Sequence, residues 1–188
     1  MSKVKQSWLV TGIVLLALIL DQVSKVYIKT HFQLGEAREV FSWFHIVFIE
    51  NDGMAFGIEW FSKFVLTLFR ILAVGVLGYY THLIIHKQQV RTGYLTSVAM
   101  VIAGALGNII DCVFYGKIWG EGDWFYGKVV DMLYFPLIHD AEGNCVFFPA
   151  VFNIADSFIT VAIFLILIFY RKDFDKSLNT IFPPKEKK

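Results

Sequence analysis

Four aspartates could carry chemistry in this chain, because each stands beside or within a strongly apolar stretch. Asp21, Asp111 and Asp156 lie near the ends of three apolar runs, and Asp131 follows two valines. An ionisable side chain at membrane depth is unfavourable unless it is paired or faces a polar cavity, and carboxylates placed there serve proton transfer or cation binding. If the apolar runs alternate in direction across a membrane, the four carboxylates fall at one level. We therefore expect them to converge on a single acidic site.

Asp131 and Asp156 each have a structural interpretation beside the functional one. Asn153, three residues before Asp156, is typical of a helix cap followed by a carboxylate in the first turn. Asp131 could be a solvated loop residue, but the apolar residues at 129–130 and 132–133 argue against exposure. The residues alone leave both interpretations open.

The other two aspartates have polar neighbours at helical spacing. Asp21 and Lys25 are four residues apart on one helix face, which favours a simple surface ion pair worth roughly 0.2–0.5 kcal/mol. Asn108 and Asp111, one turn apart, form a polar stripe on an otherwise apolar segment, with the small Gly104 nearby. Close packing of a second helix explains a glycine there, but it does not explain Asp111.

The remaining reactive side chains offer weaker candidates. Arg70 lies within an apolar run and can either snorkel outward or neutralise one of the acids, and the sequence does not choose between these roles. His82 and His86 are expected to be interfacial residues, and Cys112 and Cys145 to be incidental thiols. The sequence lacks a serine nucleophile elbow, a His-Glu-x-x-His helix and a phosphate-binding glycine loop, and we expect no metal site or cofactor.

The elements that position these residues are predicted to be membrane spans. The chain is 56% apolar and 18% charged with a mean hydropathy of +0.58, so lipid must cover much of its surface. A spanning helix needs about 20 predominantly apolar residues. Four windows satisfy this requirement: 8–27, 64–85, 94–115 and 152–170.

The charges predict the orientation of the four spans. Ten Lys and Arg residues lie in the two ends and in the 86–93 loop, against six toward the other side of the spans, so the positive-inside rule places both termini in the cytoplasm. The first run ends in Asp21 without a small-x-small cleavage site, which predicts an uncleaved span. The net charge of +1 gives no reason to expect nucleic acid as a partner.

Two segments remain on the outer side, 28–63 and 116–151, and both are too long to be simple turns. Residues 40–49 are rich in aromatic and β-branched types and precede turn formers at 51–53, which predicts a strand or hairpin near the lipid interface. We expect one membrane-embedded domain over residues 1–188, with a cytoplasmic tail at 171–188.

Five short motifs in this order resemble those of the lipoprotein signal peptidase family, also called signal peptidase II. Any one alone would be weak, but together they span nearly the whole chain and agree with the predicted topology. The motifs are Asp-Gln-Val-Ser-Lys at 21–25, Asn-Asp-Gly-Met-Ala-Phe at 51–56, Gly-Ala-Leu-Gly-Asn-Ile-Ile-Asp at 104–111, Val-Val-Asp at 129–131 and Phe-Asn-Ile-Ala-Asp-Ser at 152–157.

The resemblance implies an aspartic endopeptidase of the bacterial inner membrane, with its site at the periplasmic face. Such an enzyme removes the signal peptide from prolipoproteins, cutting just before a cysteine that carries diacylglyceryl. It further implies an α-helical membrane fold of four transmembrane helices with a small extracytoplasmic β-cradle, and Asp131 and Asp156 as the catalytic pair. The matching substrate-binding or supporting positions are Asp21, Lys25, Asn51, Gly53, Gly104, Asn108, Asp111, Asn153 and Ala155.

One position departs from the family pattern. The third motif usually continues from its aspartate into arginine, but here Cys112 follows Asp111. Arg70 or Lys128 could supply the missing charge, or the charge could be dispensable. Two other functions remain open from the residues alone: a small transporter or channel subunit, whose intramembrane acids relay protons or bind a cation, and a non-enzymatic membrane scaffold.

Overall fold

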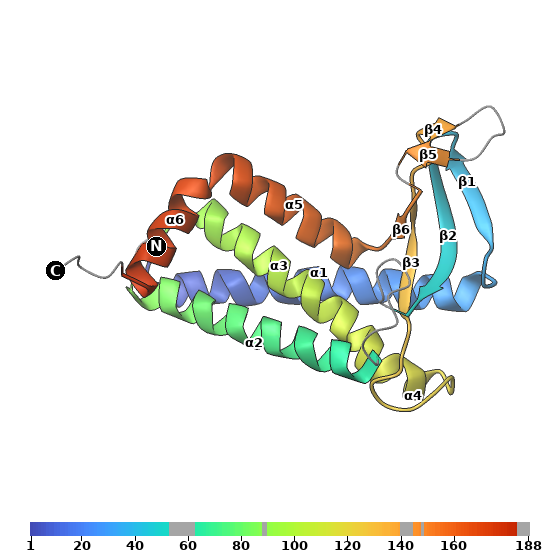
Figure 1. The fold of residues 1–188 in the computed structure, drawn as a ribbon, viewed down its shortest axis with the longest axis horizontal. Helices are drawn as coiled ribbons and strands as arrows, with labels where there is room; N and C mark the ends of the chain where they lie inside the picture. Colours follow the sequence, from blue (N-terminus) through green and yellow to red (C-terminus); the bar gives the residue numbers. More distant parts are fainter. Residues whose placement is uncertain (53–62, 88–89, 140–144, 148, 184–188) are drawn as a thin grey trace.

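Three long helices form the body of the protein. The computed structural model describes residues 1–52, 63–87, 90–139, 145–147 and 149–183. Helices α1 (Lys3–His31), α2 (Lys63–Lys87) and α3 (Thr92–Ile110) run along the bundle, and the N-terminus lies at the end opposite the sheet (Figure 1). A π-helical turn, Asp111–Tyr115, and the short α4 (Gly116–Ile118) continue α3. α1, α2 and the stretch Thr92–Ile118 are each long and apolar enough to cross a membrane.

The fourth predicted span, 152–170, contains one helix, and a second helix follows it at a sharp bend. α5 (Ile154–Phe169) and α6 (Arg171–Ile181) meet at an angle of 88°. Only the two helices together are long and apolar enough to count as a fourth membrane span. α6 lies across the end of the bundle (Figure 1). Arg91 holds this bend, since its guanidinium donates to Asp173 Oδ2 at 2.7 Å and to the Phe169 carbonyl at 2.6 Å. The sequence pattern predicted a tail from residue 171 and did not indicate the helix in it.

A small antiparallel sheet covers one end of the helices. Its order is β1 (Ala37–Phe41), β2 (Phe44–Asn51), β3 (Val129–Tyr134) and β6 (Val151–Phe152). A separate two-stranded sheet contains β4 (Ile138–His139) and β5 (Cys145–Phe147). The strand or hairpin predicted at 40–49 is a hairpin, with its turn at 42–43. These elements confirm a helical membrane fold with a small sheet.

Two apolar clusters hold the fold together, and one of them joins the sheet to the helices. The C-terminal end of α1 packs under the sheet through Ile28 and the following Phe32, which meet Phe48 of β2 and Val130 of β3. A second cluster at the opposite end of the bundle packs α2 against α3. Many apolar side chains elsewhere on the helices are exposed, as expected for surfaces that face lipid. The first cluster fixes the height of β3, and therefore of Asp131, against the helix ends.

Candidate active site

Asp131 and Asp156 come from different elements and are joined by one amide. Asp131 lies on β3 and is 2% exposed, whereas Asp156 lies in the first turn of α5 and is half-buried. Asn153 is the N-cap of α5, because its Oδ1 accepts the Asp156 backbone N–H at 2.9 Å. Its Nδ2 donates to Asp131 Oδ1 at 2.7 Å. The predicted cap is therefore confirmed, and the same side chain connects the two acids.

The side-chain amide of Asn108, on α3, links this pair of acids further by binding the Asp156 carboxylate. Asn108 Nδ2 donates to Asp156 Oδ1 at 2.7 Å. Asn108 Oδ1 accepts from Lys25 Nζ at 2.9 Å and from Asn153 Nδ2 at 3.1 Å. Because the two donors hold this oxygen, the amide nitrogen of Asn108 must face Asp156. The network Asp131–Asn153–Asn108–Asp156 thus sets the orientation of both carboxylates.

Burial makes Asp131 an unusual acid. Burial raises the pKa of Asp131 to about 7, helped by the negative charge of Asp156, although hydrogen bonds from Asn51 and Asn153 favour the ionised form. Asn51, the last residue of β2, donates Nδ2 to Asp131 Oδ2 at 3.1 Å. A carboxyl group with a pKa near neutrality can both hold and release a proton under working conditions.

Lys25 lies at the centre of a buried ion triad. Its Nζ is 2.9 Å from Asp21 Oδ2 and 2.8 Å from Asp111 Oδ2, and the three side chains are at most 2% exposed. The Asp21–Lys25 pair predicted from spacing is confirmed, but the expectation of a weak surface interaction is wrong. Two carboxylates and one ammonium out of water depend on one another far more strongly than an exposed pair does.

The triad reaches the backbone beside each candidate catalytic residue. Asp21 Oδ1 accepts the Ala155 N–H at 2.9 Å, one residue before Asp156. Asp111 Oδ2 accepts the Val130 N–H at 3.3 Å, one residue before Asp131. This contact supplies the reason for Asp111 that helix packing did not. The triad therefore links α1 and the π-helical turn after α3 to the two elements that carry the acids, β3 and the start of α5.

Gln22 is a member of this network that spacing did not single out. Its Nε2 donates to Asp21 Oδ2 at 3.1 Å and to Asp111 Oδ1 at 2.9 Å. Gln22 also accepts from the Tyr115 hydroxyl at 3.1 Å. The available signal was an uncharged polar residue at the end of an apolar run, next to Asp21.

Small residues let α3 and α5 approach closely enough for these contacts. A Cβ on Gly104 would lie 2.3 Å from the Ala155 carbonyl oxygen, and a Cβ on Gly107 would lie 2.5 Å from Asp21 Oδ2. Ala155 itself is fully buried. The close helix packing predicted from Gly104 is confirmed, and it brings Asn108 within reach of α5.

The two acids face different cavities. Asp156 and Asn108 line a cavity of about 360 Å³ between α2, α3 and α5, whose other walls are mostly apolar. Asp131 and Asn51 line a cavity of about 420 Å³ bounded by β2 and by residues 149 and 151. The pair therefore stands between an apolar space among the helices and a polar space at the sheet.

The structure also locates the candidates for the charge missing at position 112. Arg70 of α2 lines the 360 Å³ cavity with Asp156, and its Nη1 lies 3.2 Å from Cys112 Sγ. Lys128 instead pairs with Glu50 at 3.3 Å. Cys112 and Cys145 are not joined by a disulfide. The structure therefore favours Arg70 over Lys128. Gly53 lies outside the described residues.

Comparisons with known proteins agree on one family. A family model described as Signal peptidase (SPase) II matches residues 13–171. The chain is 40% identical over 194 residues to the lipoprotein signal peptidase of Porphyromonas gingivalis, covering 90% of this chain and 86% of that protein. It is 34% identical over 184 residues to the lipoprotein signal peptidase of Amoebophilus asiaticus, covering 87% and 78%. A solved bacterial membrane enzyme structure superimposes with a TM-score of 0.67 at 29% identity, covering 95% of this chain and 93% of the other.

Proposed function

Because the chain belongs to the lipoprotein signal peptidase (signal peptidase II) family of membrane aspartic proteases, which cleave signal peptides from prolipoproteins, we propose that Asp131 and Asp156 form its catalytic pair. The observation that carries the proposal is the amide chain through Asn153 and Asn108, which joins the two carboxylates and sets the direction of each. The supporting residues of the motifs would then act by positioning. The whole chain would work as one peptidase domain.

The pair would divide the acid and base roles between its members. Two interacting carboxyl groups tend to hold one proton between them near neutral pH. Burial, which raises the pKa of Asp131 to about 7, favours Asp131 as the carrier of that proton. Asp156 would take a proton from a water molecule as the water oxygen attacks the scissile carbonyl carbon, while Asp131 donates its proton to the carbonyl oxygen. As the tetrahedral intermediate collapses and its C–N bond breaks, Asp156 would pass the proton taken from water to the leaving amine, and Asp131 would regain its proton from a hydroxyl of the intermediate.

The apolar cavity beside Asp156 suits the hydrophobic segment of a signal peptide. Arg70, Ala73, Val74 and Leu77 of α2 form one wall of this cavity. Ala73 and Leu77 also line a larger apolar groove of about 820 Å³ between α2 and α6. We propose that the signal-peptide helix lies along this wall, with its scissile bond at the outer end.

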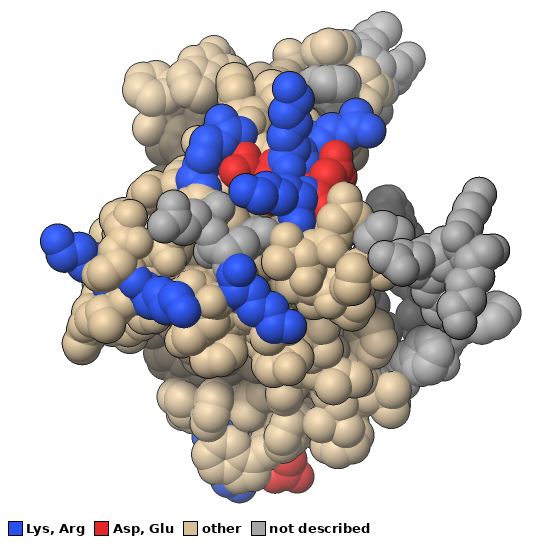
Figure 2. Space-filling model, turned by 90° about the vertical axis from the view of Figure 1, so that its left-hand side faces the viewer, with Lys and Arg blue, Asp and Glu red and all other residues tan. Residues whose placement is uncertain are grey.

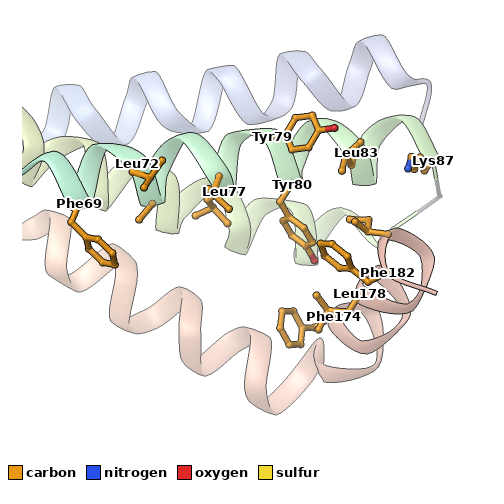
Figure 3. Close-up of a pocket in the computed structure, with 13 residues that line it drawn as sticks. Phe69, Leu72, Leu77, Tyr79, Tyr80, Leu83, Lys87, Phe174, Leu178 and Phe182 are labelled. Atoms are coloured by element: carbon orange, nitrogen blue, oxygen red, sulfur yellow. The ribbon is translucent and has the colours of Figure 1, made fainter. Parts of the chain in front are cut away.

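The larger groove would hold the cytoplasmic part of the signal peptide. Figure 3 shows Phe174 and Leu178 of α6 opposite Tyr80 of α2 at this end of the bundle. The hydroxyl of Tyr80 is hydrogen-bonded to Tyr94 and Ser177, so α6 is anchored to the bundle where the groove ends. α6 therefore forms a fixed wall of the groove, against which an apolar helix can pack.

The proposed location is the bacterial inner membrane, with both termini in the cytoplasm and the acidic pair at the periplasmic face. Lys and Arg side chains are prominent on the face that carries the N-terminus and α6 (Figure 2), and the sheet lies at the opposite end (Figure 1). This charge distribution supports the orientation. A diacylglyceryl group on the cysteine after the scissile bond could then stay in the outer leaflet during cleavage.

The proposal is tested by cleavage of a diacylglyceryl-modified precursor by the purified protein, with the unmodified precursor in parallel. Asp131→Asn and Asp156→Asn should each abolish cleavage, because a side-chain amide can neither take a proton from water nor give one to the carbonyl oxygen near neutral pH. Asp123→Asn is the matched control, since that side chain is 84% exposed and should be replaceable without effect. Full activity in either of the first two variants would rule out the assignment, and equal cleavage of both precursors would rule out the need for the lipid.

A further inference from the structure

Arg70 places a guanidinium at a depth in the bundle where a charged group is unfavourable unless it is paired or faces a polar cavity. It lies seven residues into α2 from Lys63, which corresponds to roughly 10 Å along the helix from its outer end. Its side chain is half-buried and lines the same cavity as Asp156 and Asn108. A guanidinium at this depth is a candidate for function in its own right, because lipid does not solvate it.

The hydrogen bond from Arg70 to the Cys112 thiol can be exchanged for a stronger one to an oxygen acceptor. Nη1 lies 3.2 Å from Cys112 Sγ, and a thiol is only a weak hydrogen-bond acceptor. A guanidinium carries five N–H donors in a fixed planar arrangement, which match carbonyl and carboxylate oxygens. An incoming carbonyl oxygen would therefore displace the thiol contact at small cost.

A bound signal peptide would bring such oxygens to this place. The peptide enters as a helix, but the scissile bond must be extended for water to reach its carbonyl, so the helix must end before the bond. The last four carbonyls of a helix have no partner within it, and they form the negative end of its dipole. At membrane depth they require donors from the protein. On the path proposed above, this last turn lies beside the outer end of the cavity, where Arg70 is found.

We propose that Arg70 caps the C-terminal turn of the bound signal-peptide helix by donating hydrogen bonds to its free carbonyls. Arg70 is then a positioning residue, which holds the scissile bond at Asp156 without touching the reacting atoms. The guanidinium stands against the side chain of position 112, where the family motif usually has arginine. In this chain α2 supplies the charge that α3 does not. The inference rests on the proposed function and on the path of the signal peptide.

The first test separates binding from chemistry in purified Arg70→Met. We expect KM to rise roughly 10- to 100-fold, equivalent to about 1.4–2.8 kcal/mol, with kcat changed by no more than about threefold. The two limbs of the pH–rate profile should stay in place. An unchanged KM, or a shift of either limb, would overturn the inference, because a shift would mean that Arg70 acts on the acidic pair. Arg171→Met, at an exposed arginine of α6, serves as the control with wild-type kinetics.

A second pair of variants keeps the inference testable if Arg70→Met does not accumulate. Arg70→Lys retains the charge but loses the planar donor set, so KM should rise by roughly three- to tenfold. Arg70→Ala combined with Cys112→Arg should bring KM back to within about threefold of wild type, because it returns a guanidinium to the cavity from the π-helical turn after α3. A normal KM in the first variant, or no recovery in the second, would contradict the inference. Failure of the proposed function is distinguishable, since Asp131→Asn or Asp156→Asn would then still cleave the precursor, whatever KM the Arg70 variants show.

Discussion

Removal of the Lys25 ammonium is the sharpest test of the positioning network. Lys25→Met keeps much of the side-chain volume but leaves Asp21 and Asp111 buried without their common cation. Loss of one partner from a buried ion pair destabilises a protein by about 3–5 kcal/mol. The sequence spacing alone would predict roughly 0.2–0.5 kcal/mol for an exposed i,i+4 pair. The two estimates differ by about tenfold, so the measurement can separate them.

The assay is thermal unfolding of the purified protein in detergent, with precursor cleavage measured on the same samples. For a protein of this size, 1 kcal/mol corresponds to about 2–4 °C, so Lys25→Met should lower Tm by about 6–20 °C. Cleavage should fall further than the loss of folded protein explains, because Asn108 also loses one of the two donors that orient its amide toward Asp156. Lys117→Met is the control, since its pair with Asp123 is exposed and should add little.

Neutral partners provide the counter-test. In Lys25→Met combined with Asp21→Asn and Asp111→Asn, no buried charge lacks a partner, so much of the lost stability should return while cleavage stays low. A Tm within about 2 °C of wild type for Lys25→Met alone would refute the reasoning. The same conclusion would follow if the triple variant were less stable than the single one.

Three further predictions concern the proton of Asp131 and the packing of α3 against α5. The pKa of about 7 that Asp131 has in the folded protein exceeds the ordinary aspartate value of 3.8, so the folded state holds the extra proton between these values and stability should decrease as pH rises from about 4 to 7. Asp131→Asn should flatten this part of the Tm–pH curve, and an unchanged slope would contradict it. Asn51→Ala removes a donor that favours the ionised form, so the pKa of Asp131 should rise further and the corresponding limb of the pH–rate profile should move to higher pH. Gly104→Val should push α5 away from α3, because even its Cβ would lie 2.3 Å from the Ala155 carbonyl oxygen; a loss of Tm of several degrees together with lost cleavage is expected, and wild-type behaviour would show that the helices can separate freely.

The membrane fold and the level of the acids could be predicted because both depend on local composition. Apolar runs of spanning length mark helices in any context, and they place residues at their ends at one depth. Asp21, Asp111, Asp131 and Asp156 were expected together on this basis, and the structure joins them in one hydrogen-bonded network. Their chemical roles stay predictions, which the variants above would test.

The tertiary structure decided how each residue is used, because burial and partners depend on segments far apart in the sequence. Lys25 and Asp21 read as a weak surface pair until Asp111, 86 residues after Lys25, completed a triad without access to water. The bend at Tyr170 was not predicted either, since it depends on Arg91 reaching across from the start of α3. Asn153 could be recognised as a helix cap from its neighbours alone, but its second hydrogen bond, to Asp131 on β3, exists only in the folded protein. Helix ends and apolar spans are local properties of the chain, whereas the pairing of two acids through two amides requires α1, α3, α5 and β3 to meet at one point.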